Sequence, residues 1–145
     1  MTGFPGFPKG MPTFFRGLSK NNNRDWFMAH KEDFEQSVKA PMTTLVDALN
    51  QELQEAAPQY VTDPSRAIYR IYRDTRFSKD KTPYKDHLGA LFTPRTGPKH
   101  GCAALYCGVS HDIVEIGAGI YMPGPEQLLQ VRSLLAARHH EFDHL

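Results

Sequence analysis

A stretch of thirteen residues, RDTRFSKDKTPYK at positions 73 to 85, is denser in charged and hydroxyl side chains than any other part of the sequence. It holds five cations, two aspartates and three serine or threonine hydroxyls. Arginine presents a planar fork of donors that matches a phosphate or carboxylate, and lysine adds a mobile point charge. The stretch therefore predicts binding of a small anionic or phosphorylated ligand. The residues predicted to bind it are Arg73, Arg76, Lys79 and Lys85, with Tyr84 as a wall of the site.

A solvated loop is the alternative interpretation of this stretch, because most runs of charge are simply hydrated. In that case Asp74 pairs with Arg76, and Asp80 pairs with a lysine. Such surface pairs typically contribute only ~0–1 kcal/mol, so stability alone gives little reason to concentrate so many charges. No glycine lies between positions 66 and 88. That excludes a glycine-rich phosphate loop and leaves the binding to side chains.

Three side chains are candidates for proton transfer if the protein is an enzyme: His30, Asp74 and His87. His30 follows Trp26 by four residues, one turn along a predicted helix, and histidine titrates near neutral pH. A structural role also explains His30: Trp26 belongs to the core, and the histidine satisfies a buried polar partner. The sequence leaves open whether His30 meets the basic stretch, and it identifies no cofactor.

Histidines near the end of the chain form the pattern HEFDH at 140 to 144, which matches the HExxH spacing of zinc proteases. Such a site needs two histidines on one helix turn, a glutamate base and a third ligand farther on. Only Leu145 follows in this sequence, so no metal site is predicted. Adventitious metal binding is the interpretation that we favour over catalysis, and its ligands would be His139, His140 and His144.

Size and composition predict one globular domain. The chain has 145 residues, of which 40% are hydrophobic and 23% charged, with a net charge of +1. That charge gives no overall attraction to nucleic acid, so a nucleic-acid-binding module with base-stacking tyrosines is the less favoured alternative. No apolar run reaches the ~18 residues of a membrane span. We expect a cytoplasmic protein with a flexible segment at 1–12, a single domain at 13–145, and no disulfide between Cys102 and Cys107.

The spacing of apolar residues predicts an α+β fold with N-terminal helices packed on an antiparallel sheet of about four strands. Helical periodicity runs from about Arg24 to Ala40 and again from Met42 to Pro58. The predicted strands are 67–73, 87–93, 102–109 and 112–122. A C-terminal helix from Pro125 is expected to complete the layer, and close backbone packing or a bulge is expected at Gly117 and Gly119. The predicted buried stripe of that helix is Leu128, Val131, Leu134 and Leu135.

Three segments of the sequence resemble one known family. They are NNNRDWFMAHK at 21–31, RIYRDTRFSKDKTPYKDH at 70–87 and GAGIYMPGPEQLLQVR at 117–132. In order and spacing they resemble the domain-of-unknown-function 2461 family, and the resemblance runs from about Pro12 to the last residue. It implies a soluble protein of mixed helix and sheet, and it carries over no catalytic residue.

The resemblance also implies a third class of function. Members of that family usually continue beyond the last helix, which ends here near Arg138, so this chain is expected to lack the C-terminal part of the domain. An incomplete domain exposes apolar surface and favours self-association. The protein would then be a structural or interaction protein without a small-molecule site.

Overall fold

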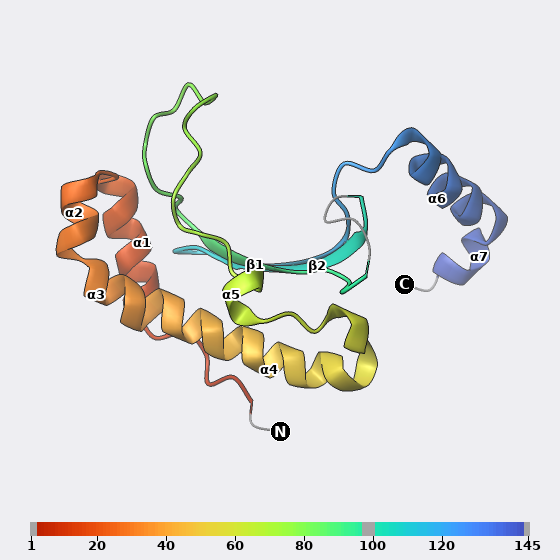
Figure 1. Ribbon diagram of the computed structural model, residues 1–145, viewed down its shortest axis with the longest axis horizontal. Helices are drawn as coiled ribbons and strands as arrows, with labels where there is room; N and C mark the ends of the chain where they lie inside the picture. Colours follow the sequence, from red (N-terminus) through yellow and green to blue (C-terminus); the bar gives the residue numbers. More distant parts are fainter. Residues whose placement is uncertain (1–2, 97–100, 144–145) are drawn as a thin grey trace.

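The computed structural model describes residues 3–96 and 101–143. N-terminal helices cover one face of a three-stranded antiparallel sheet, and a C-terminal helix follows the last strand (Figure 1). The predicted α+β fold is therefore confirmed. The elements are α1 (Gly10–Lys20), α2 (Arg24–Ala29), α3 (Lys31–Phe34), the π-helix η1 (Glu35–Lys39), α4 (Ala40–Ala56), the 3-10 helix η2 (Pro58–Tyr60), α5 (Pro64–Ala67), β1 (Leu88–Phe92), β2 (Ala103–Val109), β3 (Val114–Ile120), α6 (Pro125–Ala137) and α7 (His139–Phe142).

The core lies between the N-terminal helices and one face of the sheet. Asn23 starts α2 by accepting a hydrogen bond from the Trp26 amide at 2.9 Å. Helix α1 begins at Gly10, within the segment 1–12, and its Met11 already belongs to the core. None of the helices in the described residues is both long and apolar enough to cross a bilayer. The largest fully buried side chains are Phe15, Phe92, Leu18, Met42, Leu88, Val38 and Val46.

The helical run from α3 through η1 into α4 contains one wide turn, the π-helix η1. Buried residues of this run fall every four positions, and their exposed fractions are 6% or less. In a regular α-helix such a series rotates by about 40° per step, away from the core. The wider π turn takes up part of that rotation, so one face holds the whole series. The series is Phe34, Val38, Met42 and Val46.

The sheet has three strands in the described residues, in the order β1-β2-β3 with both pairs antiparallel. The prediction of a fourth strand at 67–73 is wrong. That segment makes only two isolated bridges, Ile68 to Ala90 and Tyr72 to Tyr84. Four positions separate 68 from 72, whereas six separate 84 from 90, so the partner segment carries two extra residues. Because of this break in register, no continuous ladder forms.

The C-terminal part of the chain packs differently from the prediction. Helix α6 has no buried residue, so the predicted buried stripe is wrong: Leu128 is only half-buried, and Val131, Leu134 and Leu135 are 42%, 47% and 43% exposed. After β3 the chain turns at Met122, which has a positive φ of 51°, and α6 then leads away from the helical layer (Figure 1). In the described residues, the faces of α6 therefore stay open to solvent.

Strand β3 is also uncovered. Ile116 is 86% exposed, and a Cβ added at Gly117 or Gly119 would meet nothing within 4 Å. The close backbone packing or bulge predicted at these two glycines is therefore wrong within the described part of the chain, where β3 pairs with β2 in an unbroken register. The two cysteines are free, as predicted, and Cys107 is buried.

Candidate functional site

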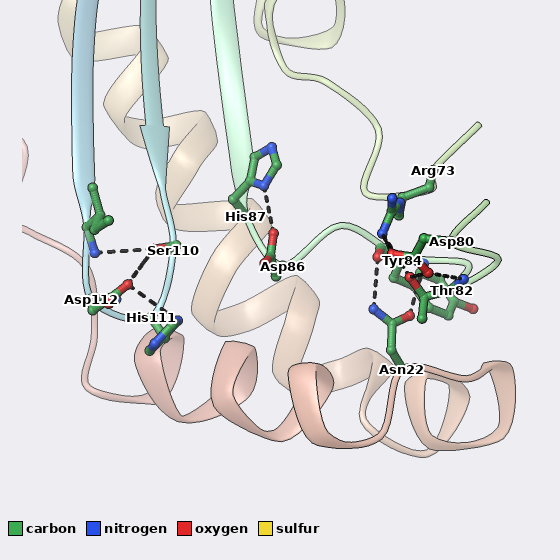
Figure 2. A network of polar contacts seen from close by, with 11 residues as sticks. Asn22, Arg73, Asp80, Thr82, Tyr84, Asp86, His87, Ser110, His111 and Asp112 are labelled. Carbon is green, nitrogen blue, oxygen red and sulfur yellow. Dashed lines mark hydrogen bonds and ion pairs between the residues drawn. The ribbon is translucent and has the colours of Figure 1, made fainter. Parts of the chain in front are cut away.

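The loop formed by residues 73–85 is anchored at its base to the N-terminal helices. The Asn22 side chain donates to the Tyr84 carbonyl at 2.9 Å and accepts from the Tyr84 amide at 3.0 Å (Figure 2). The Tyr84 ring stacks on Phe27 with centroids 4.1 Å apart. Two residues that lie 62 positions apart in sequence thereby meet, and the loop rises from a fixed base (Figure 1).

Two of the five cations of the loop are neutralised by its own aspartates. Arg73 pairs with Asp80 and also donates to the Thr82 hydroxyl at 2.9 Å. Arg76 pairs with Asp74 through two side-chain hydrogen bonds of 3.0 and 2.7 Å, which lower the pKa of Asp74 to about 2. The pairing of Asp74 with Arg76 was predicted for a solvated loop, whereas Asp80 pairs with an arginine in place of a lysine.

The two lysines at the tip of the loop, Lys79 and Lys81, have no carboxylate partner among the described residues. Lys81 donates to the Thr75 carbonyl at 2.8 Å. Lys79 is exposed and makes no hydrogen bond or ion pair with any described residue. The tip of the loop therefore offers one free cation among the described residues, on a long and mobile side chain.

Three basic side chains lie close together lower down, where the loop joins the sheet. We define the basal cluster as Arg70, Lys85 and His87. These residues line one hollow of about 140 Å³, together with Tyr69, Leu88, Gly89 and Tyr106. Within the described residues, neither Arg70 nor Lys85 makes an ion pair. The Lys85 ammonium lies over the Tyr69 ring, 5.3 Å from its centroid.

The pKa of Lys85 reflects its position in the basal cluster. Its burial and, to a lesser extent, the neighbouring Arg70 lower the pKa of Lys85. Both causes disfavour the ammonium form, so a bound anion that contacts Lys85 would offset them. Lys85 and His87 both lie between Tyr84 and Ala90, in the segment that carries the two extra residues.

Comparison with known proteins adds one finding. Residues 11–145 match the family described as "Conserved hypothetical protein (DUF2461)". The chain belongs to this family. Neither the curated proteins nor the solved structures contain a match. In this DUF2461 chain, the segments 21–31 and 70–87 meet through the Asn22–Tyr84 contact, whereas 117–132 lies in β3 and α6, away from the loop.

The candidate proton-transfer residues of the DUF2461 chain separate into two places. Asp74 and His87 line a second hollow of about 380 Å³, which also includes Arg73, Lys85 and Asp86. His87 Nδ1 lies 2.9 Å from Asp86 Oδ1 (Figure 2), and this hydrogen bond lowers the pKa of Asp86. His30 lines neither hollow.

His30 instead packs against its own helix. Its ring stacks on Trp26 with centroids 3.9 Å apart, and Nδ1 lies 2.8 Å from the Trp26 carbonyl oxygen. This is the alternative in which the histidine satisfies a neighbouring polar group. Tyr84, the predicted wall of the site, is 3% exposed and belongs to the core, where burial raises its pKa.

Arg70 is the site residue that the sequence analysis did not select. It falls in the strand-like segment RIYR, whose pattern predicts a strand of the sheet. The available signal was the alternation of that segment, which places a cation between two apolar residues near a sheet edge. The described residues contain no group of three or more side chains that could hold a metal ion. His144 lies outside the described residues.

Proposed function

We propose that this DUF2461 protein is a cytoplasmic protein that binds a small anionic, phosphorylated ligand at the basal cluster. One observation carries the proposal. Arg70 and Lys85 line the same hollow, and neither contacts a carboxylate among the described residues. Like charges held together disfavour their own ionisation, and an anion between them removes that cost. Two free cysteines support a reducing compartment.

The hollow has a suitable size for one anionic group. Its volume of about 140 Å³ is below the ~300–1,000 Å³ of typical small-molecule sites, so it suits a single phosphate or carboxylate group. The proposal therefore keeps Lys85 from the predicted ligands and adds Arg70, while Arg73 and Arg76 hold the loop together through their aspartates.

Titration with inorganic phosphate tests the proposal. We expect saturable binding by calorimetry and a rise in the unfolding midpoint, because a ligand that binds the native state stabilises it by mass action. Lys85→Ala and Arg70→Ala should each weaken phosphate binding by about tenfold, since each removes one charge-assisted hydrogen bond of roughly 1.5 kcal/mol or more.

Lys79→Ala is the matched control. Its side chain is exposed and lines neither hollow, so phosphate affinity should stay unchanged. The proposal is wrong if phosphate binding does not saturate, or if Lys79→Ala weakens phosphate binding as much as Lys85→Ala does. A nucleic-acid-binding module would instead show affinity for oligonucleotides that falls steeply with salt, as each neutralised phosphate releases counterions.

We also propose that the chain associates with a second copy of itself through β3. This strand pairs with β2 along one edge and has no strand partner along the other within the described residues. Antiparallel pairing of two β3 strands about Gly117 sets Glu115 opposite Gly119 of the second copy, so no like charges meet. The glycines let two backbones approach closely, and such an open, apolar edge favours pairing.

Self-association is measured by analytical ultracentrifugation over a range of concentrations. We expect a monomer–dimer equilibrium that Ile116→Lys shifts at least tenfold toward monomer, because a charge on an edge strand blocks further pairing. The control is Phe77→Lys, at a side chain that is 93% exposed in the loop. A monomer at every concentration, or an equal shift in both variants, contradicts pairing through β3.

A further inference from the structure

A larger groove adjoins the basal cluster. It has a volume of about 790 Å³ and lies between the helical run α2 to α4 and the chain that leads from α5 into the loop. Three residues, Tyr69, Arg70 and Leu88, line both the groove and the 140 Å³ hollow. A ligand whose anionic group lies in the hollow therefore has a neighbouring space for the rest of its body.

The shape of the groove follows from the π turn. Its helical wall is a row of polar side chains at spacings of four residues, on a different face from the buried series at 34, 38, 42 and 46. Since the π turn offsets the rotation of a four-residue series, this row also runs straight along the groove. Glu35 and Lys39 pair with each other at 3.1 Å and neutralise the middle of the row. The row is Lys31, Glu35, Lys39 and Thr43.

The rest of the lining is predominantly apolar. Ile68 is half-buried, Tyr72 is 51% exposed, and neither contacts the anion hollow. Clefts of this volume that join an apolar surface to a few convergent polar groups are the usual form of small-molecule sites. The apolar surface suits a hydrocarbon body, while Arg70 at the junction suits the anionic end.

We infer that the ligand is an amphiphile: a phosphate monoester whose apolar body lies in the groove while its phosphate contacts Arg70 and Lys85. This inference rests on the proposed anion site. It adds the chemical class of the ligand, because inorganic phosphate would leave the groove unused. Binding buries apolar surface, so affinity should grow with the length of the hydrocarbon chain.

A homologous series of ligands tests the inference. Affinities of inorganic phosphate, n-butyl phosphate and n-hexyl phosphate are measured by calorimetry at one ionic strength. Each methylene that enters the groove should tighten binding by roughly threefold, so that hexyl phosphate binds about tenfold tighter than butyl phosphate. Tyr72→Ala removes part of the groove wall and should reduce this gain to threefold or less, with phosphate affinity unchanged.

Two further variants test whether the alkyl chain lies in the groove or on β3. Thr43→Phe places a larger side chain on the helical wall and narrows the groove. It should weaken the binding of hexyl phosphate and leave the binding of inorganic phosphate unchanged. Ile116→Ser changes an apolar side chain on β3 that is 86% exposed, and the gain with chain length should survive it. This control detects alkyl chains that merely adhere to the open face of β3.

The outcomes separate the inference from the proposed function. If phosphate binds and Lys85→Ala weakens it, but hexyl phosphate binds no tighter than phosphate, the amphiphile inference is overturned and the anion site stands. If the gain disappears in Ile116→Ser and persists in Tyr72→Ala, the chain lies on β3 and the inference is overturned. If neither phosphate nor any ester binds, the anion site itself is wrong.

Discussion

Replacing Asn22 with alanine will lower the free energy of unfolding by about 2–3 kcal/mol. A hydrogen bond typically contributes about 1 kcal/mol, and an unsatisfied buried backbone group costs about 1–3 kcal/mol. Asn22 makes two bonds to the backbone of Tyr84, a residue that is only 3% exposed. Its loss leaves both the amide and the carbonyl of Tyr84 without their partner at the base of the loop.

Urea unfolding of Asn22→Ala measures this effect, and Asn21→Ala is the matched control. The Asn21 side chain donates to the Gly17 carbonyl at an exposed position, so its loss should cost about 0.5 kcal/mol or less. Phosphate affinity should also fall in Asn22→Ala, because Lys85 follows the released residue. Equal stability of the two variants would show that the Asn22–Tyr84 contact does not hold the loop.

Deleting Gln36 from the middle of the helical run will change the free energy of unfolding by less than about 1.5 kcal/mol, far less than a deletion in regular helix. Gln36 is exposed and lies in the π turn, and among the described residues its side chain bonds only to Glu32, at 2.9 Å. Its removal converts the wide turn into an α-turn. Phe34 and Val38 then become neighbours at a spacing of three, which still share one helix face.

Deleting Asp47 is the control, because it is exposed but lies in the regular part of α4. Every later residue then rotates by about 100°. That rotation breaks the two bonds by which Asn50 holds Thr62, at 2.7 and 3.0 Å. The rotation also removes Leu49 and Leu53 from their packing positions. Together these changes should lower the free energy of unfolding by roughly 3 kcal/mol or more. If deletion of Gln36 costs as much, the π turn does not set the register of the core.

Much of the N-terminal half could be predicted from the sequence. The spacing of apolar residues from Phe27 to Leu53 predicted helices, since this signal acts within one or two turns. The segment from Arg24 to Ala40 is helical as expected, but it is divided at His30, contains a π turn after Phe34 and continues into α4. Local spacing does not show which turn is wide, because that depends on the core that the helix faces.

The sheet was harder to predict because pairing is not local. The segment AIYRIYR has the alternation of a strand, yet the two extra residues on its partner side prevent a ladder. Helix α6 has the apolar pattern of a packed helix, and a sequence pattern identifies a face without saying what covers it. The same limit applies to the site. Arg73 and Arg76 had the composition of anion ligands, but Asp80 and Asp74 were close enough to neutralise them first.

The base of the basic loop and helix α6 differ in how firmly they are packed, and this difference determines which of them opens locally. The basic loop, which its composition would make the most mobile part, is fixed at its base to α2 through Asn22 and the stacked rings of Phe27 and Tyr84. Helix α6 has the sequence of a core element and buries no residue. Segments with few buried contacts exchange their amide hydrogens through small local openings, and well-packed segments exchange only through larger ones. The loop base and α2 therefore form one cooperative unit, while α6 samples open states independently of the rest of the fold.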